Sequence, residues 1–564
     1  MTAPTAGASD RRAGWGGASG PEVARWFHRA LALVFLVAWV SLATQVRLLV
    51  GSHGLMPLAD FLDAARAQGA LSVRTFPSWL ALAPGDGALL AGTWLGIALA
   101  LLGLGGVRPR LCVALQTILY LGYVLACRTF LAFQWDNLLL ECGLLAACLS
   151  TLPTLPASST GRTAPVVHLL FRALLFKLYF ESGIAKWQSP LGDWRDGSAM
   201  TFYYETAPLP TALAWHAHHL PRAWHLFESR ATLAIELVVP FAVFGPRRAR
   251  LAAAAVLTTF QILNVATANY GFFCFLSLGL HLFLLDDQDV RRCAAWWAAR
   301  RSRLFARVPC LALRAQIAHR MRALLKRAGA PQPARSPSPS PVGTPATRAP
   351  RRASAVAHAV LGKAGMAGWI LLSVGQALFH FGDPGPGTTR ALLPMLEWTQ
   401  TFRVVNTYHL FAAITRERIE PEFQVQAQNG DGNGDGNGDG GDWTALHLRY
   451  KPGDPARAPS FVAPHQPRVD FQLWFFGLAH ERRQPAYVAD LVARLCDDPD
   501  AVAPLFRSPL PARRRAVRIA FWRTTFTSPA ERRATGDWWS RRAIGATPPW
   551  RCDGPPDGPR AEGH

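Results

Sequence analysis

The strongest constraint on this chain is a series of apolar runs long enough to cross a bilayer. A membrane-spanning helix needs about 20 mostly apolar residues, and such runs recur through most of the first 380 positions. The expected spans are 26–48, 87–107, 111–131, 133–153, 166–187, 229–245, 250–268, 271–286 and 355–378. Because the run at 133–153 is polar, a re-entrant segment is its alternative. The sequence predicts a mainly α polytopic helical membrane bundle with a C-terminal soluble α+β domain.

The distribution of basic residues predicts how the bundle is oriented. A net charge of +22 suggests nucleic acid in a soluble protein, but here the basic residues cluster between apolar runs, so no nucleic-acid partner is expected. The connections at 108–110, 246–250 and 287–354, with the loop around Arg162, are basic and are expected in the cytoplasm. The N-terminus is then cytoplasmic and the C-terminal domain lumenal or extracytoplasmic. An even number of spans would instead place that domain beside the basic loop.

The expected organisation follows from these runs and from the composition between them. It comprises a disordered cytoplasmic tail (1–25), a bundle of about eight spans (26–286) with external loops at 49–86 and 188–228, a basic cytoplasmic loop and disordered linker (287–354), a last transmembrane helix (355–378), an external α+β domain (400–550) and a tail (551–564). Within the basic loop, 291–327 is expected to form an amphipathic helix on anionic lipid headgroups.

The C-terminal domain alternates strand-like and helix-like patterns. Strands are predicted at 422–428, 445–450 and 517–527, and helices at 471–478 and 487–495. Between the first two strands lies the stretch NGDGNGDGNGDGGD (429–442), which fits an EF-hand calcium loop loosely. No helices flank this stretch and glycine alternates through it, so a hairpin insertion is the favoured interpretation.

Ionisable residues inside the apolar runs mark the candidate site. Each costs roughly 2.5–3.5 kcal/mol at the centre of a membrane helix, so these residues must pair or line a wet cavity. Glu141 and Lys177 reach similar depth on successive antiparallel helices, which predicts that they pair. The expected buried polar network comprises Asp136, Asn137, Glu141, Arg172, Lys177, Glu181, Lys186 and Glu236, with Asp136 near Glu181 and Lys186. It is interpreted either as pairs that set helix register or as a polar cavity open to the external side.

Histidines and cysteines suggest no metal or redox site. The external loop contains His216, His218, His219 and His225, but no carboxylate or cysteine completes a metal-ligand spacing, so solvated histidines are expected. The nine cysteines include no CxxC pair, which argues against a disulfide framework. A Cys496–Cys552 bridge stays open as a possibility if the C-terminal domain faces an oxidising compartment. No metal and no cofactor are expected.

Seven blocks of sequence carry a family resemblance. They are FQWDNLLLECG (133–143), KLYFESGIAKWQSPLGDWRDGSAMTFYYET (177–206), NYGFFCFL (269–276), FRVVNTYHLFAAITRERIE (402–420), YKPGD (450–454), FVAPHQPRVDFQLWF (461–475) and GDWWSR (536–541). In these blocks the chain resembles the lipase maturation factor family of multi-pass membrane proteins. The resemblance implies a factor of the endoplasmic reticulum membrane, or of the inner or plasma membrane if the chain is bacterial. Such a factor helps secreted lipases fold and assemble into active dimers, and its C-terminal domain engages the partly folded client.

A second resemblance leads to a different function. Tyr179–Lys186 and Trp194–Met200 are similar to a block in vitamin K-dependent gamma-carboxylase. This resemblance implies that Lys186 is a base beside a membrane-soluble cofactor. The corresponding hypothesis is an enzyme in which Glu141, Lys177 and Glu181 organise the pocket. A transporter would show inverted repeats, and none is visible.

The favoured hypothesis is a chaperone-like, non-enzymatic maturation factor whose partners are partly folded clients and membrane lipids. Aromatic and Arg side chains suit client contacts because they bury a large area. The candidates are Trp443, Arg468, Trp474, Trp538 and Trp539, and the alternative for the tryptophans is an ordinary place in the core.

Overall fold

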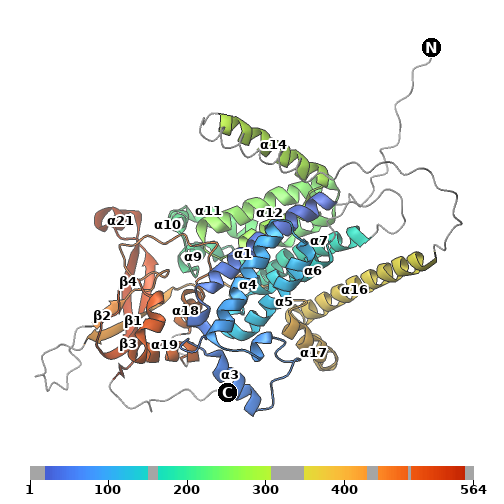
Figure 1. The fold of residues 1–564 in the computed structure, drawn as a ribbon. Helices are drawn as coiled ribbons and strands as arrows, with labels where there is room; N and C mark the ends of the chain where they lie inside the picture. Colours follow the sequence, from blue (N-terminus) through green and yellow to red (C-terminus); the bar gives the residue numbers. More distant parts are fainter. Residues whose placement is uncertain (1–19, 150–162, 307–348, 428–442, 480–483, 553–564) are drawn as a thin grey trace, which may run out of the picture.

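The computed structural model describes residues 20–149, 163–306, 349–427, 443–479 and 484–552. Helices pack into a bundle, and a small sheet with its own helices lies against one end of that bundle (Figure 1). The predicted fold class, mainly α with a C-terminal α+β domain, is confirmed. The predicted N-terminal tail, the loop around Arg162, most of the linker and the glycine/aspartate stretch lie outside the described residues.

The helical part is built from these elements: α1 (Pro21–Ala43), α2 (Val46–Val50), α3 (Leu58–Ala67), η1 (Trp79–Ala81), α4 (Asp86–Leu104), α5 (Pro109–Cys127), η2 (Arg128–Leu131), α6 (Gln134–Cys148), α7 (Thr163–Trp187), α8 (Asp193–Asp196), α9 (Ala199–Thr206), α10 (Ala212–His218), α11 (Arg222–Leu237), η3 (Val239–Phe244), α12 (Arg247–Thr267), α13 (Phe273–Leu280), η4 (His281–Leu284), α14 (Asp287–Ala306), α16 (Ala349–Phe381) and α17 (Gly385–Phe402).

Among the described residues, five helices are long and apolar enough to cross a membrane: Pro21–Ala43, Asp86–Leu104, Pro109–Leu131, Arg247–Thr267 and Ala364–Phe381. The chain is therefore a multi-pass membrane protein. The other expected spans coincide with α6, with α7, with α11 and η3, and with α13 and η4, which are charged, short or interrupted. At about 1.5 Å per residue, α6 is shorter than a hydrocarbon core of about 30 Å, so both interpretations of this segment stay open.

Contacts between the ends of helices show which connections lie together. The backbone N–H of Gly20, before α1, donates to Asp287 Oδ1 at the start of α14 (2.9 Å). Arg250 of α12 pairs with Asp286 (2.9 Å), and a ring nitrogen of His28 lies 3.1 Å from the carbonyl oxygen of Ala146 near the end of α6. Arg110 also donates to the carbonyl oxygen of Ala147 (2.9 Å), so the described parts of the basic connections at 108–110, 246–250 and 287–306 share one end of the bundle. Which face of the membrane this end occupies stays a prediction.

The chain does not leave the bundle directly after α16. Gln376 of α16 donates to Thr399 of α17 (3.0 Å), so α17 folds back along α16. The following residues, 403–418, then run through the bundle without regular secondary structure before β1 begins. We call residues 403–418 the threaded segment.

The C-terminal domain packs helices on a sheet that is antiparallel throughout. Its elements are β1 (Ile419–Ala427), β2 (Trp443–Leu446), α18 (Arg468–Leu478), α19 (Ala486–Asp497), α20 (Pro499–Val502), η5 (Ala503–Leu505), β3 (Arg514–Phe526), α21 (Pro529–Thr535), β4 (Trp539–Ala546) and β5 (Trp550–Arg551). The strand order is β2-β1-β3-β4, with β5 also paired to β3. Phe423 lies opposite Leu446 on β2 and Ile519 on β3, and all three side chains are buried.

Most predicted elements of this domain are present, with shifted bounds. The strands predicted at 422–428 and 517–527 correspond to β1 and β3, and both predicted helices correspond to α18 and α19. The strand expected at 445–450 is β2, which ends at Leu446. A disulfide joins Cys496 of α19 to Cys552 after β5. The bridge that the sequence left open is thus formed.

Candidate functional site

The threaded segment is held by charged and polar side chains of the bundle. The Tyr408 N–H donates to Glu181 Oε2 (2.8 Å), and the His409 N–H donates to Gln134 Oε1 (2.8 Å). The carbonyl oxygen of Leu410 accepts a hydrogen bond from Lys186 Nζ (2.7 Å). Backbone that is not helical must find its partners within the protein when water is excluded. The buried side chains of α6 and α7 supply those partners.

The second half of the threaded segment is held in the same way. Trp194 of α8 donates its ring N–H to the carbonyl oxygen of Phe411 (3.1 Å), and the Ile414 N–H donates to Asp193 Oδ2 (2.9 Å). These contacts connect Trp187–Glu205, the aromatic stretch after α7, to the approach to β1.

Glu141 lies at the centre of the first of three ionic clusters. Lys177 Nζ lies 3.3 Å from its Oε1, so the predicted pair is present. Its Oε2 accepts hydrogen bonds from Asn406 Nδ2 (3.1 Å) and from the Tyr408 hydroxyl (2.7 Å). Glu141 is fully buried and Lys177 is nearly so. A buried carboxylate with this many donors is compensated, whereas an unpaired one would be costly.

The second cluster corrects the sequence analysis. Asp136 was expected near Glu181 and Lys186, but it pairs with Arg468 of α18, at 2.6 Å from Nη1 to Oδ2 and 2.8 Å from Nη2 to Oδ1. The Tyr120 hydroxyl donates to the same carboxylate (2.6 Å). Such a bidentate pair is strong and directional, and here it joins the C-terminal domain to the bundle.

The third cluster lies where the threaded segment becomes β1. Glu420 pairs with Arg418 (2.6 Å) and with Lys451 (2.8 Å), and all three side chains are buried. Arg418 also donates to the carbonyl oxygen of Pro208 (3.0 Å). Burial lowers the pKa of Lys451, and the nearby Glu420 opposes that shift. These contacts connect the sheet to the loop after α9.

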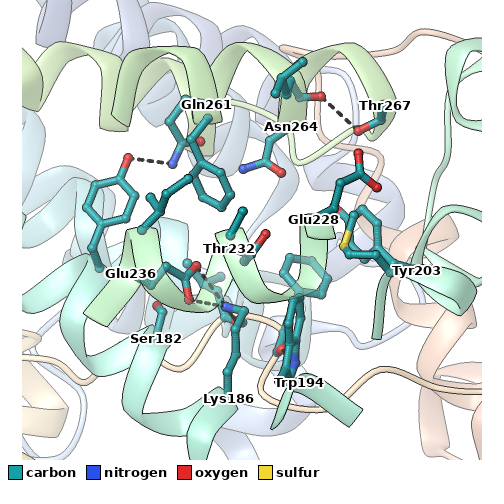
Figure 2. A pocket seen from close by; sticks show the side chains of 18 of the residues that line it. Ser182, Lys186, Trp194, Tyr203, Glu228, Thr232, Glu236, Gln261, Asn264 and Thr267 are labelled. Atoms are coloured by element: carbon teal, nitrogen blue, oxygen red, sulfur yellow. Dashed lines mark hydrogen bonds and ion pairs between the residues drawn. The ribbon is translucent and has the colours of Figure 1, made fainter. Parts of the chain in front are cut away.

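Lys186 lies at the edge of a cavity of about 310 Å³ that residues of α7, α9, α11, α12 and the threaded segment line (Figure 2). Its Nζ lies 2.7 Å from Glu236 Oε2 and donates to the Leu410 carbonyl, and it lies 5.2 Å from the centre of the Trp194 ring. The prediction that Glu236 joins the polar interior is therefore confirmed. In the enzyme hypothesis Lys186 is the catalytic base. Its ammonium group is already engaged by two acceptors, the Glu236 carboxylate and the Leu410 carbonyl oxygen.

The remaining members of the predicted network have separate environments. Arg172 donates to the carbonyl oxygen of Phe283 (2.9 Å). Asn137 lines a second cavity of about 280 Å³, together with Gln376, Arg403 and His409. In the described part of the chain, one buried side-chain atom of each of these four residues has no hydrogen-bond partner. A polar cavity of this size is suited to ordered water.

The predicted client-binding side chains are less accessible than expected. Arg468 and Trp539 are both 2% exposed, so assigning them to a client-binding surface is wrong. Trp443, Trp474 and Trp538 are partly buried. Trp474 donates its ring N–H to the Thr206 carbonyl oxygen (2.9 Å), while Arg518 lies over Trp443 and Arg532 over Trp538. For Trp539 the alternative interpretation is correct: its side chain is part of the hydrophobic core.

The loop histidines match the expectation only in part, because His216 is exposed and the others are not. His225 is buried, with a ring nitrogen 3.3 Å from Glu228, so it is not solvated. Burial lowers the pKa of His218 to about 4, and the neighbouring His219 and His225 act in the same direction. Within the described residues, no three His, Cys, Asp or Glu side chains are grouped closely enough to hold a metal ion.

Sequence reasoning missed the partners that the threaded segment and the C-terminal domain contribute. Asn406, Tyr408, Arg418 and Glu420 all lie in the block at 402–420, which was noted only for its resemblance. A signal was present, because the block combines apolar residues with several polar and charged ones outside any predicted element. Their partners in the bundle could not be identified, because Glu141, Glu181 and the loop after α9 lie more than 200 positions away, as the Asn406–Glu141 contact shows.

Fold and site together define the class. The chain is a multi-pass helical membrane protein whose α+β domain is locked to one end of the bundle by buried ion pairs and a threaded segment. Residues 23–292 match the family model of the lipase maturation factor transmembrane domain, and residues 404–549 match that of the lipase maturation factor C-terminal domain.

Curated relatives agree with both matches. The chain is 31% identical to lipase maturation factor 2 of Homo sapiens, over 92% of this chain and 81% of that protein. It is 29% identical to lipase maturation factor 1 of Bos taurus, over 92% of this chain and 86% of that protein. The chain belongs to the lipase maturation factor family. No solved structure matches it.

Proposed function

We propose that this protein is a membrane-bound, non-enzymatic maturation factor that assists the folding and assembly of secreted lipases. The observation that supports this best is the joint match to both family domains, over 92% of the chain, with relatives named for lipase maturation. The compartment is the endoplasmic reticulum membrane or, in a bacterium, the inner or plasma membrane, with the C-terminal domain on the non-cytoplasmic side. Clients meet the domain there in a partly folded state.

The edge strand β4 is the element best suited to hold such a client. Residues 542–546 are exposed, and Ile544 is 44% exposed. In the part of the domain that the structure describes, β4 pairs with β3 on one side and with no strand on the other. An open edge offers backbone donors and acceptors to any extended chain. A lipase that has not completed its own sheet presents such a chain.

The test is lipase maturation by the full-length protein in cells that lack their own factor. Ile544→Lys should lower the yield of active secreted lipase, because a charged side chain on an edge strand opposes pairing. Val73→Lys is the matched control, since Val73 is 78% exposed and lies outside the domain. Equal yields for the two variants would remove β4 from the proposal. Unchanged yield in cells without the protein would overturn the proposal itself.

The alternative, an enzyme with Lys186 as base, keeps one supporting observation, because Lys186 borders the larger cavity. Lys186→Met alone would leave Glu236 buried without its partner, so Lys186→Met with Glu236→Gln is the better variant. If the double variant folds and still supports lipase maturation, Lys186 does not act as a catalytic base in that function. Loss of maturation with an unchanged melting temperature would favour the enzyme.

A further inference from the structure

The cavity of about 310 Å³ beside Lys186 is separate from the strand β4 that is proposed to hold a client. We call it the α11–α12 cavity, because residues of these two helices line it (Figure 2). Three of its lining side chains are strongly exposed and mark its mouth, namely Trp224 (45%), Phe227 (59%) and Leu263 (59%). Leu263 lies on α12, which is long and apolar enough to cross a membrane, and an exposed apolar mouth of this kind suits an approach from the bilayer.

The interior of the cavity is apolar with a few polar groups that lack partners. Gln261 is 2% exposed, and its Nε2 donates to the Tyr179 hydroxyl (2.8 Å), but its buried Oε1 has no partner among the described residues. Asn264 and Thr232 point into the same space (Figure 2), and in the described chain neither side chain makes a hydrogen bond. Buried polar atoms are normally satisfied, so the free Gln261 Oε1 is the exception here, while Asn264 and Thr232 are only partly buried. All three groups are available to a ligand.

The charges at the cavity argue against an anionic ligand. The ionisable carboxylates on its wall are Glu228 and Glu236, and its lining cation is Lys186. Lys186 is engaged with Glu236, and Glu228 accepts a hydrogen bond from the Tyr204 hydroxyl (3.0 Å). Among the described lining residues no unpaired cation is left for a phosphate or a carboxylate, and the wall is net negative.

We propose that the α11–α12 cavity binds a neutral lipid that carries a free hydroxyl group, such as a diacylglycerol, and that this lipid enters from the bilayer between α11 and α12. One acyl chain lies along the apolar wall and the other extends toward the bilayer. The hydroxyl donates to Gln261 Oε1 and accepts from the Asn264 amide. This proposal is independent of the proposed function in lipase maturation.

Photolabelling of the full-length protein in phosphatidylcholine nanodiscs tests the site. The probe is a diacylglycerol with a diazirine on one acyl chain, and labelled peptides are identified by mass spectrometry. Labelling is expected on α11 and α12, and unlabelled diacylglycerol should compete with it. Phosphatidic acid with the same acyl chains should not compete. If it competed as strongly as diacylglycerol, the proposal that the ligand is a neutral lipid would be wrong.

Two variants separate the cavity from the outer surface of the bundle. Ala231 lines the cavity, whereas Ala234, one turn further along α11, is exposed and does not. Ala231→Trp should reduce labelling to background and Ala234→Trp should leave it unchanged. Asn264→Leu, which breaks no hydrogen bond seen in the described residues, should weaken diacylglycerol competition about two- to tenfold. Equal labelling of all variants and the unaltered protein would overturn the proposal, because the lipid would then lie on the surface.

Discussion

Around the carboxylate of Glu141, three donors come from two distant parts of the chain: Lys177 from α7, and Asn406 and Tyr408 from the threaded segment. Asp136 is surrounded in a similar way by Arg468 and Tyr120. Each buried charge is thus compensated by groups that arrive from outside its own helix. These residues help to specify one arrangement of the chain. Removing one partner of a cluster leaves the other charge buried without compensation, which lowers the free energy of unfolding.

Arg468→Ala should destabilise the protein by about 3–5 kcal/mol, because it leaves Asp136 buried without its cation. The melting temperature in detergent measures the loss. Arg513→Ala is the matched control, since Arg513 is exposed in the same domain and a surface change of this kind is worth about ±0.5 kcal/mol. Similar melting temperatures for the two variants would contradict the role given to the Asp136–Arg468 pair.

His465 should make stability depend on pH. Burial lowers the pKa of His465 to about 4, and the cation of Arg468 acts in the same direction. The ring nitrogen Nδ1 also lies 2.9 Å from Ser41 Oγ of α1. Because the folded state favours the neutral ring, its contribution is complete above the ordinary pKa of about 6.5 and is lost as the pH falls toward 4.

The measurement is the fall in melting temperature between pH of about 7.5 and about 4.5, compared with His465→Gln. The variant should show a smaller fall than the unaltered protein. Asp470 contributes in the opposite sense, because burial raises the pKa of its carboxyl to about 6, but it is present in both proteins and cancels in the comparison. An equal fall in both would show that folding does not lower the pKa of His465.

At the scale of elements, the threaded segment is the unusual feature. A helix satisfies its own backbone, and a strand satisfies it through a sheet, whereas residues 403–418 depend on side chains of α6, α7 and α8. The backbone of the threaded segment therefore needs the buried ionisable side chains as hydrogen-bond partners, and Glu141 and Glu181 need the segment as a source of donors. Cutting the chain at residue 400 would remove both the domain and the partners of Glu141 and Glu181, so such a truncation cannot report on the domain alone.

Tyr408→Phe should destabilise the protein by about 1–3 kcal/mol, because it removes one donor to the buried carboxylate of Glu141. Tyr450→Phe is the matched control. The Tyr450 side chain is partly buried, and its hydroxyl makes no hydrogen bond with the described residues. Unfolding followed by tryptophan fluorescence in detergent compares the two. An equal effect would mean that the hydroxyl of Tyr408 does not support the threaded segment.

At the scale of the whole molecule, the two ends of the bundle are chemically different. One end carries the described basic residues at 108–110 and 246–250 with α14, and the other carries the α+β domain with the Cys496–Cys552 disulfide (Figure 1). Disulfides persist in oxidising compartments. The domain is therefore expected outside the cytoplasm, in agreement with the positive-inside rule.

A labelling experiment tests this orientation with a natural reporter. Cys293 of α14 is a free, exposed cysteine, and Ser540→Cys places a second thiol on exposed β4. With Cys148 replaced by serine, a membrane-impermeant maleimide should label position 540 on intact membranes and Cys293 only after permeabilisation. The reverse order would place the domain in the cytoplasm and contradict the proposed meeting with secreted clients.

The sequence by itself determined the class of fold, because apolar runs and the placement of basic residues are local patterns. It also determined the Glu141–Lys177 pair, since depth along two successive antiparallel helices follows from residue counting. Only the tertiary structure decided the partner of Asp136, which lies more than 300 positions away at Arg468.

The tertiary structure also decided which aromatic and Arg side chains are exposed, and it alone revealed the threaded segment and the α11–α12 cavity. These features depend on how distant elements pack together. Hydropathy and spacing show that a residue will be buried or will need a partner for its charge. Only the fold determines which part of the chain packs against it or provides that partner.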